Sequence, residues 1–124
     1  MRFSLVCREN TALADHPSKA LKQLRAWCVE ERDVNQWPGT LLLGHSGRLY
    51  IFDVNAESID VLCHAVDGLF GWLGPEEPED LAFYRNDGRV LLESIAHEED
   101  ARVYLSQDEW ESLPATLRDL LSAC

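Results

Sequence analysis

The segment with the greatest chemical potential is residues 97–100, His-Glu-Glu-Asp, which places one imidazole beside three carboxylates. A metal site would need such nitrogen and oxygen atoms to converge at about 2.0–2.2 Å. Consecutive residues seldom converge on one ion without ligands from elsewhere, and the other histidines show no ligand spacing. Acid–base catalysis by His97 would need a partner nucleophile, and none is identifiable. We therefore predict a polar loop between two strands, with no metal.

Two further patterns resemble fragments of active sites. Cys63 precedes His64, as a nucleophile beside its base. On a helix, however, adjacent residues point about 100° apart and do not face each other. Residues 44–47, Gly-His-Ser-Gly, resemble part of a phosphate-binding loop, but the lysine and the helix that follow such a loop are missing. The sequence thus predicts no catalytic residue, no cofactor and no enzyme activity.

The cysteines give an expectation about the compartment. The chain has four, and none has the spacing of a zinc ribbon or a redox motif: Cys7, Cys28, Cys63 and Cys124. The first residues hold no apolar stretch of signal-peptide length. Two of the cysteines fall on apolar faces of predicted helices, where a thiol acts as a small hydrophobic group. We expect reduced thiols and a cytoplasmic protein.

Size and composition narrow the class of protein. The 124 residues fit a single domain, residues 1–124, and 46% hydrophobic residues suffice for a core. No apolar run approaches the ~20 residues that span a bilayer, which excludes a membrane span. A net charge of −11 argues against direct binding of nucleic acid, which needs a basic face.

The negative charge is concentrated in one part of the chain. Residues 75–111 hold twelve acidic side chains against three arginines, whereas residues 1–35 carry a net charge of +1. Two clusters stand out, residues 75–80 (Pro-Glu-Glu-Pro-Glu-Asp) and residues 97–100, and both are expected in loops or at strand ends that reach outward. They have two interpretations: a docking surface for a basic protein, or a surface that keeps the protein soluble.

The first half of the chain is predicted to form a strand, a helix, a hairpin and a second helix. Residues 2–7 are β-prone, and Pro17 suits the first turn of a helix over residues 17–32, capped by Asp15 or His16. Residues 40–44 and 48–53 flank a glycine-containing spacer, which indicates a hairpin. Asn55 then caps a helix whose apolar ladder runs from Ile59 to Leu73 and ends at Gly74-Pro75.

The second half is predicted to form a meander and a C-terminal helical region. Residues 81–85 and 89–96 flank Asn-Asp-Gly, a hairpin signal, and residues 101–105 continue as a third strand. Ser106 and Glu109 form a capping-box pattern before a turn at 107–112, and a further helix is expected over 114–122. The order β-α-β-β-α-β-β-β-α predicts an α+β fold: a two-layer sandwich with a mainly antiparallel sheet and two to three amphipathic helices on one face. The other face is left open, to be solvated or to bind a second copy in a homodimer.

A stretch of the second half resembles a known class of protein. Over residues 78–112, a strand with Glu-Asp-Leu, a turn and the start of a strand at His-Glu precede a capped helix. The residues that carry this pattern are Glu79, Asp80, Leu81, Tyr84, Asp87, Gly88, His97, Glu98, Asp100 and Trp110. In this it is similar to small immunity proteins of bacterial polymorphic and contact-dependent toxin systems. The resemblance implies a cytosolic protein that binds one toxin, such as a nuclease, and blocks it.

We therefore expect an acidic inhibitor with a basic protein partner. The expected contact residues are Glu76, Glu77, Glu79, Asp80, Glu98, Glu99 and Asp100, with Trp72 and Tyr84 as apolar anchors. Trp72 lies off the main apolar stripe, so the sequence leaves open whether it is exposed or packs under the acidic loop. Two alternatives also remain open: a phage-encoded inhibitor of a host defence nuclease that acts as an acidic decoy, and an adaptor or chaperone subunit with a larger apolar interface.

Overall fold

The computed structural model describes residues 1–74, 76–115 and 118–119. Its centre is a six-stranded sheet with the spatial order β2-β5-β1-β6-β7-β8, and every pairing between neighbours is antiparallel. The strands are β1 (Arg2–Cys7), β2 (Cys28–Val34), β5 (Gly47–Asp53), β6 (Glu79–Tyr84), β7 (Val90–Ile95) and β8 (Asp100–Val103). A separate two-stranded hairpin consists of β3 (Gln36–Trp37) and β4 (Thr40–Leu41).

Short helices connect the strands. The α-helices are α1 (Lys19–Leu24), α2 (Ala56–Ala65) and α3 (Gln107–Ser112). The described residues also contain four single turns of 3₁₀-helix: η1 (Leu13–Asp15), η2 (Arg25–Trp27), η3 (Leu69–Gly71) and η4 (Ala96–Glu98). Among the described residues, no helix combines the length and the apolar character needed to cross a bilayer. The predicted α+β class with a mainly antiparallel sheet is confirmed.

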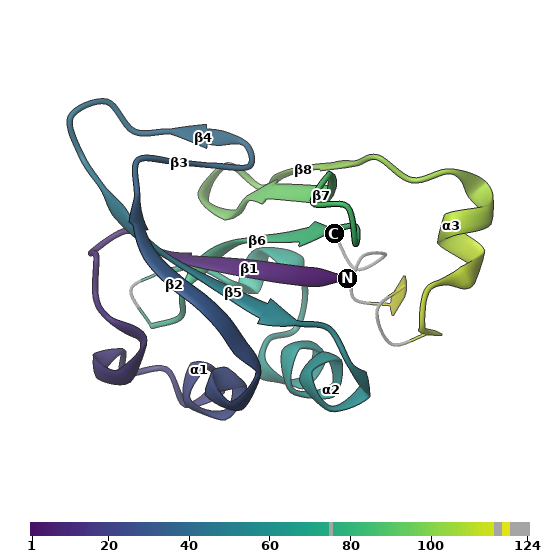
Figure 1. The fold of residues 1–124 in the computed structure, drawn as a ribbon, viewed down its shortest axis with the longest axis horizontal. Helices are drawn as coiled ribbons and strands as arrows, with labels where there is room; N and C mark the ends of the chain where they lie inside the picture. The colour runs from purple at the N-terminus through teal and green to yellow at the C-terminus, as the bar shows by residue number, and fades with distance from the viewer. Residues whose placement is uncertain (75, 116–117, 120–124) are drawn as a thin grey trace.

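The sheet has a helical layer on one face and the β3–β4 hairpin on the other (Figure 1). Alternate residues of the central strand β1 serve the two faces, as strand geometry requires. Phe3 and Leu5 belong to the large core under α1 and α2, whereas Val6 packs with Trp37 and Leu49 in a smaller cluster beneath the hairpin. The second face is therefore partly covered, and not wholly open as the sequence suggested.

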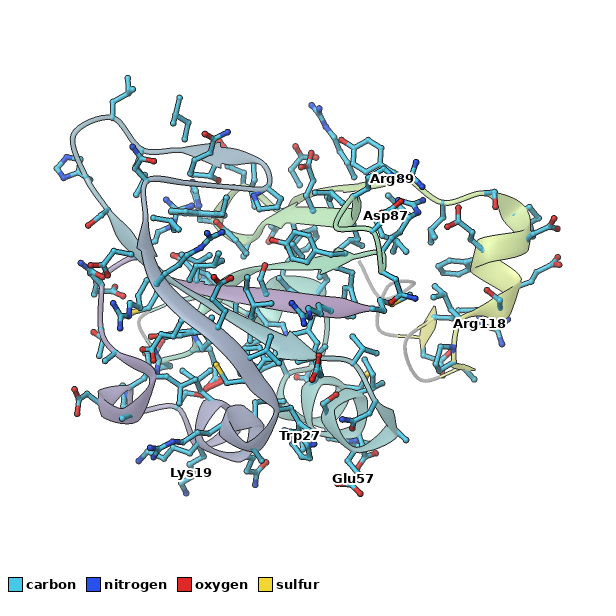
Figure 2. The ribbon with its side chains drawn as sticks, in the orientation of Figure 1. Lys19, Trp27, Glu57, Asp87, Arg89 and Arg118 are labelled. Carbon is cyan, nitrogen blue, oxygen red and sulfur yellow. The ribbon has the colours of Figure 1, made fainter. Side chains whose placement is uncertain are left out.

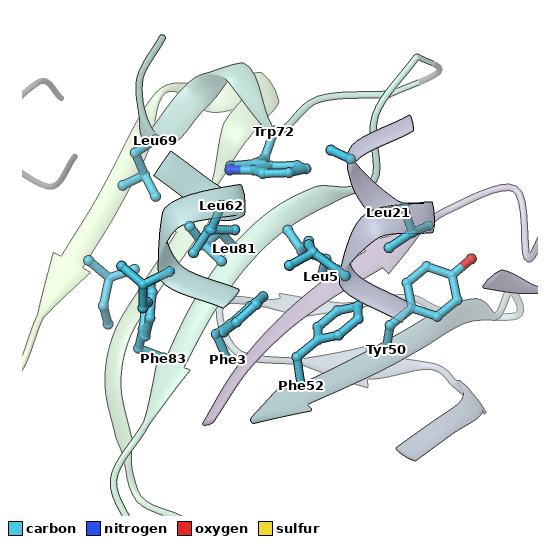
Figure 3. Close-up of a cluster of buried hydrophobic side chains, with 14 of the residues drawn as sticks. Phe3, Leu5, Leu21, Tyr50, Phe52, Leu62, Leu69, Trp72, Leu81 and Phe83 are labelled. Carbon is cyan, nitrogen blue, oxygen red and sulfur yellow. The ribbon is translucent and has the colours of Figure 1, made fainter. Parts of the chain in front are cut away.

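Aromatic side chains fill the middle of the large core (Figure 3). Phe3 stacks on Phe52 with ring centroids 5.0 Å apart and lies 5.8 Å from Phe83. These residues come from β1, β5 and β6, so one cluster joins the three central strands. Trp72 is fully buried in the same core. Burial of such large apolar side chains is the main favourable contribution to folding.

The predicted helix over residues 17–32 is wrong in its second half. The helix α1 begins after Ser18, whose side chain accepts the N–H of Leu21, so the cap is neither Asp15 nor His16. After η2 the chain extends and becomes β2, which pairs with β5 from Cys28 to Val34. Apolar residues in this stretch fit a helical period, but pairing with a central strand outweighs that local preference.

The predicted continuous helix ending at Leu73 is interrupted. Asn55 caps α2 through a capping box with Ser58, as the sequence indicated in part. The helix ends at Ala65, and Val66 and Gly68 are extended before η3 begins. A Cβ added to Gly71 would lie 2.7 Å from Val66 Cβ, so the close return of η3 onto this bend requires glycine.

The predicted hairpin between residues 40–44 and 48–53 is also wrong. Strand β5 lies between β1 and β2, and β4 pairs instead with β3 across Pro38-Gly39, where Gly39 has a φ of +87°. By contrast, the hairpin of β6 and β7, the third strand β8 and the capping box of Ser106 and Glu109 are confirmed. The helix expected over 114–122 lies partly outside the described residues.

Candidate partner-binding surface

The antiparallel order of β6 and β7 brings the two acidic segments to the same end of the sheet. Strand β6 begins at Glu79, and β7 ends just before η4, which contains His97 and Glu98. The backbone N–H of Ala96 donates to Asp80 Oδ1 at 2.9 Å, which ties the two segments together directly. Glu79 and Asp80 thus lie beside Ala96 and His97, although the connecting hairpin separates them along the chain.

Asp80 is the centre of a buried polar cluster at this end. Its side chain is fully buried, and Oδ2 accepts from Arg8 Nη2 at 2.8 Å and from Trp37 Nε1 at 2.9 Å. Arg8 also places Nε 2.9 Å from Glu79 Oε1, and its guanidinium carbon lies 5.2 Å from the centre of the Trp37 ring. The cluster fastens the β3–β4 hairpin to the ends of β1, β6 and β7.

A β-bulge orients Asp80 toward this cluster. Ser4 pairs with Ala82, but Val6 pairs with Glu79, so β6 holds one more residue than β1 in this interval. Asp80 adopts a left-handed φ of +58°, a conformation that Asp tolerates better than most residues. The neighbouring Glu79 is buried as well, and this burial raises the pKa of its carboxyl, against the opposing effect of Arg8.

Three of the expected contact residues are therefore not on the surface. Glu79 and Asp80 were expected to reach outward, but they are 6% and 1% exposed and pair with Arg8. Trp72 is 0% exposed and belongs to the large core, so it is not an exposed anchor. The expectation of outward placement is wrong for Glu79 and Asp80, because the bulge and Arg8 draw their carboxylates inward.

Tyr84 lies away from the acidic segments. It ends β6, about 17 Å along the strand from Glu79 at ~3.4 Å per residue. It is half-buried, and its hydroxyl shares a 2.8 Å hydrogen bond with Ser4 Oγ on the hairpin-side face. The structure therefore does not bring Tyr84 together with the other expected contact residues.

The remaining acidic residues do form an exposed group, which we call the acidic end. It comprises the exposed residues Glu9, Glu76, Glu98, Glu99 and Asp100, with Glu77 half-buried beside them. In the part of the chain that the structure describes, no ion pair engages any of these five carboxylates. Sequence reasoning missed Glu9, because only the fold brings the loop after β1 next to Gly74 and Glu79, where Glu9 Oε1 approaches Gly74.

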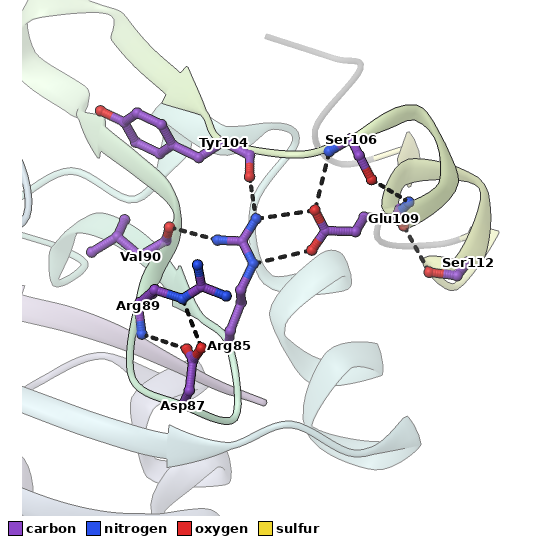
Figure 4. A network of polar contacts seen from close by, with 8 residues as sticks. All are labelled: Arg85, Asp87, Arg89, Val90, Tyr104, Ser106, Glu109 and Ser112. Atoms are coloured by element: carbon purple, nitrogen blue, oxygen red, sulfur yellow. Dashed lines mark hydrogen bonds and ion pairs between the residues drawn. The ribbon is translucent and has the colours of Figure 1, made fainter.

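The opposite end of β6 and β7 differs, because its charges are paired within the molecule (Figure 4). Arg85 donates to both carboxylate oxygens of Glu109 at 3.0 and 3.1 Å, and to the carbonyl oxygens of Val90 and Tyr104. This arginine lowers the pKa of Glu109 to about 2. Asp87 pairs with Arg89 at 2.7 Å. The strand ends at Arg85 and Arg89 thus have paired charges, whereas the acidic end carries carboxylates with no ion pair among the described residues.

Groups suited to catalysis do not assemble at either end. His97 is exposed among the carboxylates, and among the described residues no three His, Cys, Asp or Glu side chains converge as metal ligands. Cys63 is half-buried on α2, and burial raises the pKa of its thiol to about 11, so the thiolate is scarce at neutral pH. The arrangement is suited to electrostatic docking.

No protein-family model, curated protein or solved structure matches this chain.

Proposed function

We propose that this chain is a non-enzymatic inhibitor that docks a basic protein through the acidic end, in the manner of immunity proteins that neutralise a cognate bacterial toxin. The observation that carries the proposal is the contrast between the two ends of β6 and β7. At one end Arg85 pairs with Glu109 and Arg89 pairs with Asp87, whereas the five exposed carboxylates of the acidic end form no ion pair within the described part of the chain. Unpaired surface charge of one sign attracts an oppositely charged partner and speeds its association.

The buried cluster beneath the acidic end supports a docking role. Because Arg8 pairs with both Glu79 and Asp80, the exposed carboxylates stand on a fixed support of strand ends. A support of this kind lowers the entropic cost of ordering the surface when the partner binds. The combined negative field matches a cationic surface such as the phosphate-binding cleft of a nuclease toxin, whose blockage would prevent substrate from entering.

The first experiment is co-expression of the chain with the product of each neighbouring gene, scored for growth rescue and for co-purification. We expect one product to be toxic alone, harmless with this chain and recovered in a stable complex. Absence of any toxic neighbour, together with absence of any complex, would count against the immunity proposal and favour the adaptor alternative.

Charge reversal then tests the surface. The variant Glu98→Lys/Glu99→Lys/Asp100→Lys removes three carboxylates of the acidic end. Its control, Glu57→Lys/Asp67→Lys/Glu111→Lys, makes the same change in net charge at exposed sites elsewhere. Figure 2 shows Glu57 on the side of the helical layer that faces away from the sheet. We expect the first variant to slow association about 10- to 100-fold at low salt and the control to stay close to the parent. Equal effects of both variants would refute docking at the acidic end.

A further inference from the structure

The segment of residues 34–47 forms a projecting element that the acidic surface does not account for. We call it the arm: it contains β3, β4 and the loop that leads into β5 (Figure 1). It holds no Asp, Glu, Lys or Arg, although these residues make up 27% of the chain. Surface loops of a highly charged protein ordinarily carry charge, so an uncharged arm is unusual for a segment that only faces water.

Two leucines are exposed on this arm. Leu41 is 59% exposed and Leu43 is 82% exposed, the highest fractions among the large hydrophobic side chains of the described residues. Leu42 between them packs inward against the small cluster of Val6, Trp37 and Leu49. The alternation exposes Leu41 and Leu43 to solvent, while Leu42 packs the segment against the sheet. Single exposed leucines are common, but a pair on an uncharged projection is typical of a contact surface.

The arm is held in place at both sides. Trp37 is 4% exposed and donates to Asp80, and the backbone N–H of Leu42 donates to the carbonyl of Asn35 at 2.7 Å. At the turn, a Cβ on Gly39 would lie 3.3 Å from Ile95 Cγ1, so the arm lies directly against β7. The leucines therefore project from a supported hairpin, which favours binding without a large ordering cost.

The acidic end borders the arm. Gly39 and Asp100 line one small pocket, and Asn10 Nδ2 donates to Ser46 Oγ at 3.3 Å beside Glu9. An apolar patch with a charged margin has the composition of a protein interface, whose centre is depleted of charge and whose rim is polar. The adjoining carboxylates oppose contact with anionic lipid headgroups, which disfavours a membrane as the occupant.

We propose that the arm is the apolar anchor of the partner interface: Leu41 and Leu43 enter an apolar depression on a protein whose rim is basic and meets the acidic end. The inference rests on the proposed function for the sign of the rim. It adds the site of tight contact, because exposed carboxylates mainly raise the association rate whereas burial of leucines slows dissociation.

Site-specific photo-crosslinking in the native host identifies what the arm touches. The photoreactive residue benzoylphenylalanine replaces Leu43, and in a control it replaces the exposed Lys22 on α1. We expect one protein to be captured from the arm position and not from the control, and that protein is then purified. The absence of an adduct specific to the arm would overturn the inference.

The purified partner then allows a quantitative test. We expect Leu41→Ser/Leu43→Ser to weaken binding about 100-fold, mainly through faster dissociation, while the urea midpoint of the free chain is unchanged. Val29→Ser, which alters an exposed apolar residue on β2, is the matched control and retains affinity. Unchanged affinity of the double variant would overturn the inference, as would arm-dependent sedimentation of the chain with phosphatidylcholine–phosphatidylglycerol vesicles.

The outcomes separate the inference from the proposed function. Arm-dependent binding of a protein that is neither toxic nor inhibited would retain the anchor and reject the inhibitor. Neutralisation of a toxin by the leucine variant with full affinity would retain the inhibitor and reject the anchor.

Discussion

Asp80→Ala is expected to be the most destabilising substitution among the acidic residues of the chain. The change leaves the N–H groups of Trp37 and Ala96 without their acceptor, both in a buried setting, and deprives Arg8 of its closest carboxylate. It also keeps a side chain at a left-handed position that alanine adopts less readily than aspartate. The loss affects several elements together, because Trp37 lies on the hairpin, Arg8 directly follows β1 and Ala96 directly follows β7.

The expected cost follows from these contacts. Each buried donor left without a partner costs about 1–3 kcal/mol, and two such donors are created. The side chain of Arg8 is 25% exposed and keeps Glu79 as a partner, so its contribution is smaller than that of a fully buried pair. The total is about 3–5 kcal/mol, a large share of the ~5–15 kcal/mol by which domains are stable. Asp80→Asn keeps the shape and the left-handed preference, and should lose roughly half as much.

Urea unfolding followed by far-ultraviolet circular dichroism measures this difference. Glu99→Ala is the control, because its exposed side chain has no partner among the described residues, and its effect should stay within about 0.5 kcal/mol. A double-mutant cycle of Asp80→Ala with Trp37→Phe, which removes the indole donor, should give a coupling energy of about 1 kcal/mol or more. An Asp80→Ala cost below 1 kcal/mol would refute the view that this cluster holds the hairpin to the sheet.

Three further outcomes are expected. Burial lowers the pKa of His16, whose Nδ1 accepts the N–H of Ser18, so this imidazole binds a proton more readily in the unfolded chain than in the folded one. The free energy of unfolding should therefore fall as the pH drops below 6.5. Urea unfolding at pH 7.5 and 5.5 should show a smaller fall for His16→Gln than for the parent. The thiols of Cys7 and Cys63 should react slowly with a thiol reagent at neutral pH in the folded chain, because Cys7 is buried and the pKa of Cys63 is raised, and fast in urea; equal labelling rates of these two cysteines in both conditions, read by peptide mass spectrometry, would contradict this. Asn55→Ala removes the cap of α2 and should cost about 1 kcal/mol in the same urea assay, whereas no change would show that the capping box adds nothing.

The sequence predicts the local features of this fold better than its pairings. The β6–β7 hairpin and the capping box at Ser106 depend on a few adjacent residues, and both are confirmed. The second half of the helix predicted over 17–32 is strand β2, because its apolar spacing fits either period and only the distant β5 decides between them.

The acidic surface was predictable only in part, because its geometry also depends on contacts between residues that are distant in the sequence. Charge counting locates the two acidic segments, and the hairpin order brings them together. It does not show that a bulge in β6 turns Asp80 inward to Arg8, a partner from the other end of the chain. Nor does it show that Trp37 anchors an uncharged arm beside the acidic end, since that depends on packing across the second face of the sheet.

The central place of β1 has a consequence for synthesis of the chain. It is synthesised before the other strands of the sheet, yet Phe3 finds its partners in Phe52 on one side and Phe83 on the other. At ~5–20 residues per second, the nascent strand waits roughly 4–16 s before its second neighbour has been translated. During that interval β1 can pair with β5 alone and lacks β6 on its other side, so a trigger-factor-like or Hsp70-like chaperone that shields β1 should raise the yield of folded protein.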